Sequence, residues 1–201
     1  MDLDKVIESR RSVREYAEKE IPFEKIILLL NAANHTPSAG NLQTFSFVVV
    51  NDKDKKNKIA EASLKQFWMN QAPIFIVICS DIQKLETYYK ERGTKYADQN
   101  AGATAMLIEL KAADLGLASC WVNVFDQERV SKILNITSGI VPKIIITLGY
   151  EINSKIKQIP KARLSKITSF NKYGNKIADL KNWAKEKYSD KIRKLIKKYF
   201  Q

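Results

Sequence analysis

The stretch SRRSVREY, residues 9–16, carries the clearest chemical potential in this sequence. Arg10, Arg11 and Arg14 fall within five positions, and Ser12 adds a hydroxyl group between them. Clustered cations repel one another, so such a group is typical of a site that binds an anion. Guanidinium groups match phosphate oxygens in bidentate geometry, with charge-assisted hydrogen bonds. The stretch is therefore a candidate phosphate site, and a solvated face with acidic neighbours is the alternative.

A second polar group lies in TPSAGNLQTF, residues 36–45, directly before an apolar run. Ser38, Asn41 and Gln43 bring one hydroxyl and two amides into a segment that Pro37 and a glycine mark as a loop. Amides both donate and accept hydrogen bonds, so they suit the edge of a heteroaromatic ring that carries both kinds of group. An ordinary polar loop is the alternative, and composition alone favours it.

A third basic pair, Lys161 and Arg163, follows the last predicted strand and could fold back to the first arginines. The sequence has neither GxGxxG after a strand nor GxxxxGK[ST], so the usual backbone-cradled dinucleotide and triphosphate sites lack support. A phosphate would then depend on side-chain cations. With one histidine, and with Cys79 and Cys120 each inside an apolar run, a metal centre lacks ligands, and we expect none.

Strands and helices alternate along the chain, which indicates an α/β or α+β domain around one sheet. Apolar runs between polar residues predict strands at 45–52, 72–81, 119–126 and 141–150. Helical spacing predicts helices at about 4–10, 20–34, 54–67 and 96–115. The sequence shows no repeats and no low-complexity linker, so we expect a single domain over residues 1–201.

Half of the formal net charge of +12 lies near the end of the chain. Between Lys181 and Lys198, eight basic residues stand against two acidic ones, which gives +6. This segment, about 176–201, has apolar residues at helical spacing and predicts an amphipathic helix with a lysine-rich outer face. Such a helix could lie on a membrane, lie on nucleic acid, or pack on its own protein, and its large aromatic residues favour packing.

The first residues are acidic and predict no secretory signal, and the longest apolar runs are too short to cross a bilayer. We therefore expect a cytoplasmic protein.

Taken together and in order, these stretches resemble the FMN-dependent nitroreductases. The resemblance rests on RRSVR-x-Y, PSAGN-x-Q before a strand, ADLGLASCWV and a late K-x-R, and runs from about Val6 to Arg163. It implies an α+β, nitroreductase-like fold with a central, mostly antiparallel sheet flanked by helices. It also implies a homodimer in which the C-terminal extension wraps the partner. The cofactor would be FMN, with NADH or NADPH as hydride donor.

The resemblance also implies roles for individual residues. The FMN phosphate would be held by Arg10, Arg11, Ser12, Arg14, Lys161 and Arg163. The loop with Pro37, Ser38 and Asn41 would reach the flavin of the partner chain, and Asn41 and Gln43 match amides near the ribityl chain and ring. The backbone N–H groups of Asn123 and Val124 would face flavin N5 and O4. Trp68 stands where some relatives have a lysine, which leaves Arg14 as the main cation near N1 and O2.

The implied activity is that of an FMN-dependent NAD(P)H oxidoreductase. It would reduce nitroaromatic, quinone or similar small-molecule acceptors by ping-pong hydride transfer, with flavin N5 rather than a protein side chain as the reacting group. Two alternatives stay open: a protein that binds FMN without turnover, and a basic protein that binds nucleic acid or an anionic surface. We expect neither nucleic acid nor a membrane as partner.

Overall fold

The computed structural model describes residues 2–152, 160–175 and 190–199. The chain divides into two compact units, Met1–Ile156 and Lys157–Gln201. In the first unit the elements are α1 (Leu3–Ser9), β1 (Tyr16–Ala17), α2 (Phe23–Asn34), β2 (Phe45–Val50), α3 (Lys53–Ala62), β3 (Ile74–Asp81), α4 (Ile82–Tyr89), α5 (Gly93–Asp114), β4 (Ala118–Val122), α6 (Gln127–Leu134) and β5 (Ile140–Glu151). Three short 3-10 turns complete it, at Ala39–Asn41, Phe67–Gln71 and Lys90–Arg92.

Every pairing between these strands is antiparallel. The strand order is β1-β5-β3-β2, and β4 also pairs with β5. Strand β3 lies inside the sheet, where Val77 pairs with Val48 on one side and with Ile145 on the other. Its apolar run is buried almost throughout, as a strand covered on both faces requires. The predicted α+β fold with a central antiparallel sheet is therefore confirmed.

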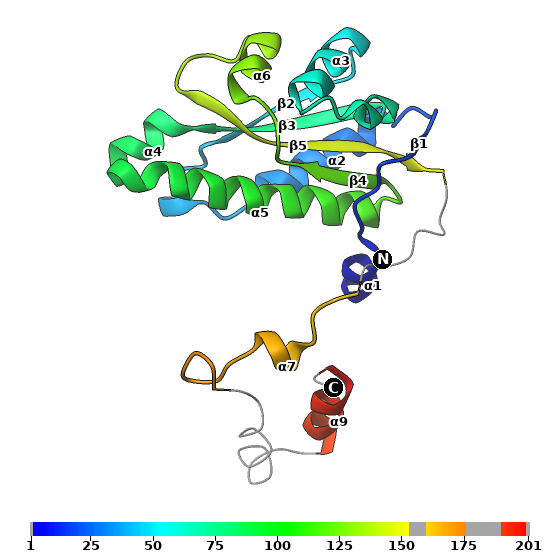
Figure 1. Ribbon diagram of the computed structural model, residues 1–201, viewed down its shortest axis with the longest axis vertical. Helices are drawn as coiled ribbons and strands as arrows, with labels where there is room; N and C mark the ends of the chain where they lie inside the picture. The colour runs from blue at the N-terminus through cyan, green and yellow to red at the C-terminus, as the bar shows by residue number, and fades with distance from the viewer. Residues whose placement is uncertain (1, 153–159, 176–189, 200–201) are drawn as a thin grey trace. The chain divides into compact units, whose positions relative to one another are not determined.

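Helices cover both faces of the sheet: α2 and α5 lie on one face, and α3 and α6 on the other (Figure 1). Because successive side chains of a strand point to opposite faces, β3 contributes to two cores. Ile76 and Ile78 pack in the cluster with α2 and α5, whereas Phe75 and Val77 pack in the cluster with α3.

The turn from α5 into β4 brings the end of this long helix back onto the sheet. Gly116 has a φ of 69°, a left-handed conformation that glycine adopts without strain. The Leu117 N–H donates to the Ala112 carbonyl at 2.8 Å, and the Gly116 N–H donates to the Ala113 carbonyl at 3.1 Å. These two bonds form a Schellman motif, which satisfies carbonyls that the helix end would leave without partners. Strand β4 then starts two residues later.

Two sequence expectations need correction. The helix expected at 54–67 ends at Ala62, because Leu64 and Lys65 both have positive φ angles, 54° and 56°. The strand expected at 119–126 ends at Val122, and α6 follows after an N-cap in which Asp126 accepts a hydrogen bond from a backbone N–H. β1, α4 and α6 were not predicted, since all three are too short to give a strong periodic pattern.

The second unit contains α7 (Leu164–Ile167) and α9 (Asp190–Tyr199). Within the predicted C-terminal helix, about 176–201, residues Asp190–Tyr199 are thus helical, whereas residues 176–189 lie outside the described part of the chain. Across the part of the chain that the structure describes, no helix is both long and apolar enough to span a membrane.

Candidate cofactor site

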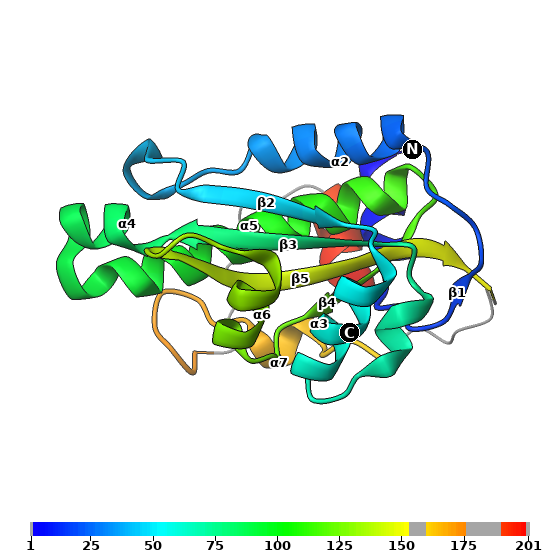
Figure 2. The same cartoon turned by 90° about the horizontal axis from the view of Figure 1, so that it is seen from above.

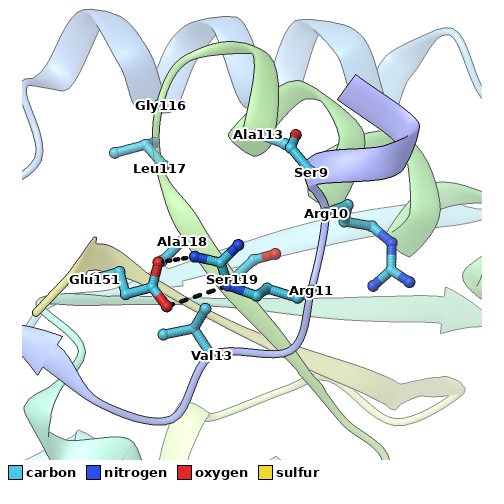
Figure 3. A pocket seen from close by; sticks show the side chains of 10 residues that line it. All are labelled: Ser9, Arg10, Arg11, Val13, Ala113, Gly116, Leu117, Ala118, Ser119 and Glu151. Atoms are coloured by element: carbon cyan, nitrogen blue, oxygen red, sulfur yellow. Dashed lines mark hydrogen bonds and ion pairs between the residues drawn. The ribbon is translucent and has the colours of Figure 1, made fainter. Parts of the chain in front are cut away.

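The arginine stretch is extended and lies beside the start of β4. Helix α1 ends where Arg10 adopts φ −61° and ψ 130°, and Ser12 then forms a parallel bridge with Ser119. An extended chain places every second side chain on the same side, which groups Arg10 with Ser12 and Arg14. Figure 3 shows that Arg10 and Arg11 point away from each other.

Arg10 contacts a buried carboxylate on α5. Its Nη1 donates to Glu109 Oε2 at 3.4 Å, and Ser119 Oγ donates to Glu109 Oε1 at 3.2 Å. Glu109 is only 1% exposed. Burial raises the pKa of the Glu109 carboxyl, while the Arg10 guanidinium and the Ser119 hydroxyl lower it in part. This contact fixes one edge of the Arg10 guanidinium against the fold.

Arg11 is paired on the other side of the stretch. Its Nε donates to Glu151 Oε1 at 3.2 Å and its Nη2 donates to Glu151 Oε2, which gives a bidentate ion pair (Figure 3). This pair lines a cavity of about 220 Å³, together with Val13, Gly116 and other residues from the end of α5 and the start of β4. Arg11 thereby ties the arginine stretch to the end of β5.

Arg14 has no carboxylate partner among the described residues and is exposed. Its guanidinium carbon lies 5.6 Å from the centroid of the Trp68 ring, within the range of a cation–π interaction. The Cys120 thiol lies beside Arg14 and Ser12; burial raises the pKa of this thiol, and both neighbours oppose that rise. Arg14 and Ser12 therefore present a cation and a hydroxyl to solvent from alternate positions of the extended stretch.

The residues expected at the ring end of the flavin follow directly after β4. Asn123 and Val124 are both exposed and lie beyond Val122, the last paired residue of the strand. The Gln66 side chain donates to the Val124 carbonyl at 3.5 Å. Asn123 lies four positions after Ser119, so a strand carries the chain about 13 Å from the arginine stretch to this point. One strand thus connects the phosphate end with the ring end.

The loop before β2 gathers the amides as the sequence predicts. The Gln43 N–H donates to Ser38 Oγ at 2.9 Å, and Gln43 Nε2 donates to Asn41 Oδ1 at 3.3 Å. Gly40, Asn41 and Gln43 all have positive φ angles, 57°, 54° and 47°. Pro37, Asn41 and Gln43 are exposed. The loop therefore presents its polar groups outward.

Within one chain, this loop and the arginine stretch are held at different places along α5. The Ala39 N–H donates to Asn100 Oδ1 at 3.2 Å, whereas Arg10 contacts Glu109. These anchors, Asn100 and Glu109, are nine positions apart in the helix, which is about 14 Å along the axis. In Figure 2 the loop that follows α2 lies toward α4, away from the N-terminus. The structure of one chain does not bring the two groups together.

The late basic pair belongs to the second unit. Lys161 and Arg163 are exposed, and Arg163 is the N-cap residue of α7. Their contact with the phosphate stays a prediction.

Glu109, Ser119 and Glu151 are the neighbours of the arginine stretch that sequence reasoning missed. One signal for Glu109 was available: it lies four residues after Ala105 and three before Ala112, on the buried face of α5. An acidic residue at a core position of a helix needs a cationic or hydrogen-bonding partner. No comparable signal marks Glu151, because its pairing depends on the tertiary fold.

Comparisons with known proteins identify the family. A family model described as Nitroreductase family matches residues 7–68 and 63–150. A protein from Archaeoglobus fulgidus, provisionally named NADH dehydrogenase/NAD(P)H nitroreductase, is 35% identical over 155 residues, which cover 75% of this chain and 86% of the relative. The chain therefore belongs to the nitroreductase family.

The names of two further relatives mention FMN. A Bacillus subtilis protein named FMN reductase [NAD(P)H] is 28% identical over 114 residues, which cover 57% of this chain and 45% of the relative. The solved structure of an FMN-dependent nitroreductase from Clostridium difficile R20291 superimposes with a TM-score of 0.73 at 29% identity, and covers 84% of this chain and 98% of that chain.

Proposed function

We propose that this protein is an FMN-dependent NAD(P)H oxidoreductase that reduces nitroaromatic, quinone or similar acceptors. Membership of the nitroreductase family and the names of its relatives support the cofactor and the hydride donor. The observation that carries the proposal is the grouping of Arg10, Ser12 and Arg14 on one extended stretch, one strand away from Asn123 and Val124.

The residues present fit a flavin mononucleotide in charge and in polarity. Arg14 has no carboxylate partner among the described residues, and Ser12 offers a hydroxyl near it, which suits a phosphate dianion. Past the end of β4, the backbone N–H groups of Asn123 and Val124 suit the acceptor atoms N5 and O4 of a flavin ring. Exposed apolar groups at this end, Phe67 at 48% and Val124 at 57%, suit the ring faces.

The remaining cofactor contacts would come from a second copy of the chain. The loop with Pro37, Ser38, Asn41 and Gln43 is held about 14 Å along α5 from the Arg10 anchor, and the nitroreductase pattern implies that it reaches the flavin of the partner chain. In a homodimer, this loop of one copy would reach the flavin held by the arginine stretch of the other. Lys161 and Arg163 would add two cations at the phosphate.

FMN, when bound, supplies the hydride chemistry at N5. The chain's own residues would hold the phosphate and orient the ring through backbone donors, with one ring face left to the substrates. The part of the chain that the structure describes has no separate nicotinamide motif, so the hydride donor and the acceptor would use that face in turn, which gives ping-pong kinetics.

The test begins with the colour of the purified protein. We expect a yellow protein that releases FMN on denaturation, oxidises NADH or NADPH when a quinone or nitroaromatic is present, and gives parallel initial-rate lines. Colourless protein that does not bind added FMN would contradict the proposal. Bound FMN without NAD(P)H oxidation would instead show the non-catalytic alternative. Intersecting initial-rate lines would contradict a pocket that the hydride donor and the acceptor share.

A further inference from the structure

Glu109 is a buried carboxylate with no direct part in the proposed chemistry. It lies in α5 with 1% of its surface exposed, between Ala105 and Ala112 on the same helix face. A buried carboxylate costs free energy unless it is paired and hydrogen-bonded. An apolar residue would fill this position without that cost.

The two oxygens of Glu109 link two parts of the arginine site. Oε1 accepts from Ser119 Oγ at 3.2 Å, which ties the carboxylate to β4. Oε2 accepts from Arg10 Nη1 at 3.4 Å. Within the described residues this is the one side-chain contact that the structure gives the Arg10 guanidinium, which has five N–H donors. The Arg10 side chain is still 23% exposed. One edge of the guanidinium is therefore anchored, and part of the side chain remains accessible to a ligand.

We propose that Glu109 is a positioning residue for the phosphate group of the cofactor: held by Ser119, its carboxylate fixes Arg10 in the orientation that receives a phosphate. This inference rests on the proposed function. An arginine that is already held in place loses less side-chain freedom when the ligand binds. The opposite role, in which Glu109 competes with the phosphate for Arg10, predicts an effect of opposite sign.

Phosphate selectivity, the Kd of riboflavin divided by the Kd of FMN, isolates this role. It is measured by isothermal titration calorimetry on flavin-free, full-length protein. We expect Glu109→Gln to lower the selectivity about 2- to 10-fold, the loss of one pre-ordered side chain, and to leave riboflavin affinity unchanged. The matched control is Asp98→Asn, which removes an exposed carboxylate of the same helix that pairs with Lys143 at 2.9 Å. It leaves the selectivity unchanged.

A second pair of variants shows whether Glu109 acts through Arg10. In an Arg10→Ala background, adding Glu109→Gln changes the selectivity no further, because residues that act as a unit are not additive. Ser119→Ala removes the other anchor and lowers the selectivity in the same direction. It carries the test if Glu109→Gln does not fold.

The outcomes separate the inference from the proposed function. Unchanged or increased selectivity in Glu109→Gln, or an equal further loss in the Arg10→Ala background, overturns the positioning role. Wild-type protein that binds FMN no better than riboflavin overturns the phosphate site itself and the inference with it.

Discussion

Removal of the Arg14 guanidinium isolates an exposed cation of the proposed phosphate site. Arg14 has no carboxylate partner among the described residues, so Arg14→Ala leaves no buried charge behind. The local loss is the contact with Trp68, 5.6 Å from the guanidinium carbon. An exposed cation–π contact contributes about 0.5–1 kcal/mol. At roughly 2–4 °C per kcal/mol for a chain of this size, the Tm falls by no more than about 4 °C.

The effect on FMN binding is much larger. A hydrogen bond to a charged group contributes about 1.5–3 kcal/mol. Because each 1.4 kcal/mol is a factor of ten, Arg14→Ala weakens FMN about 10- to 100-fold. Riboflavin lacks the phosphate, so its affinity changes by no more than about fivefold, the factor that corresponds to loss of the Trp68 contact alone.

Calorimetric titration of both flavins into wild-type and variant protein measures this difference. Arg129→Ala is the matched control, since Arg129 is a half-exposed arginine that pairs with Glu61 at 3.5 Å and lies outside the proposed site. It changes neither affinity. Equal weakening of FMN and riboflavin by Arg14→Ala would refute the assignment of Arg14 to the phosphate, because the lost contact would then be with the ring or the fold.

Three further predictions concern the fold around the site. In Gly149→Ala the new Cβ would lie 2.5 Å from the Tyr16 ring, and this overpacking lowers the free energy of unfolding by roughly 1–3 kcal/mol. Urea titration measures this change, and an unchanged urea midpoint would contradict the tight packing. Burial raises the pKa of Glu109, so the folded state favours the neutral form of this carboxyl more than the unfolded state does. This contribution to the free energy of unfolding is lost as the pH rises through the raised pKa. The Tm of Glu109→Gln, measured relative to wild type, therefore increases as the pH rises from about 4 to about 8, and a decrease would show that the charged form is the stabilised one. Burial raises the pKa of Cys79 to about 12 and also raises that of Cys120. We therefore expect neither thiol to react with iodoacetamide in native protein at pH 8, and both to react after denaturation. Mass spectrometry counts the adducts, and a labelled thiol in native protein would contradict the burial.

The sequence predicts the main elements because their signals are local. The apolar run that became β3 is buried almost throughout, and such runs indicate inner strands regardless of their partners. Gly116 marks the turn after α5, since this turn needs a positive φ. Strand β1 was not predicted, because two residues show no periodicity and its partner strand β5 lies far away in the sequence.

The site was predictable in composition but not in pairing. The sequence places three arginines together, yet it does not say that Arg10 and Arg11 meet Glu109 and Glu151, which lie 99 and 140 residues away. Such contacts depend on how α5 and β5 cross the arginine stretch. These contacts also distinguish Arg14, which faces solvent, from Arg10 and Arg11, which pair with carboxylates. Tertiary structure thus distinguishes arginines that the sequence treats as equal.

A mixed-dimer experiment tests the central claim most directly. One variant loses the phosphate contacts, Arg10→Ala with Arg14→Ala, and the other loses the loop amides, Asn41→Ala with Gln43→Ala. Each alone binds FMN weakly. After subunit exchange in an equal mixture, half of the dimers are mixed, and each mixed dimer has one site built from two unaltered halves, so about a quarter of all sites regain wild-type FMN affinity. No recovery after confirmed exchange would contradict a cofactor site shared between two copies of the chain.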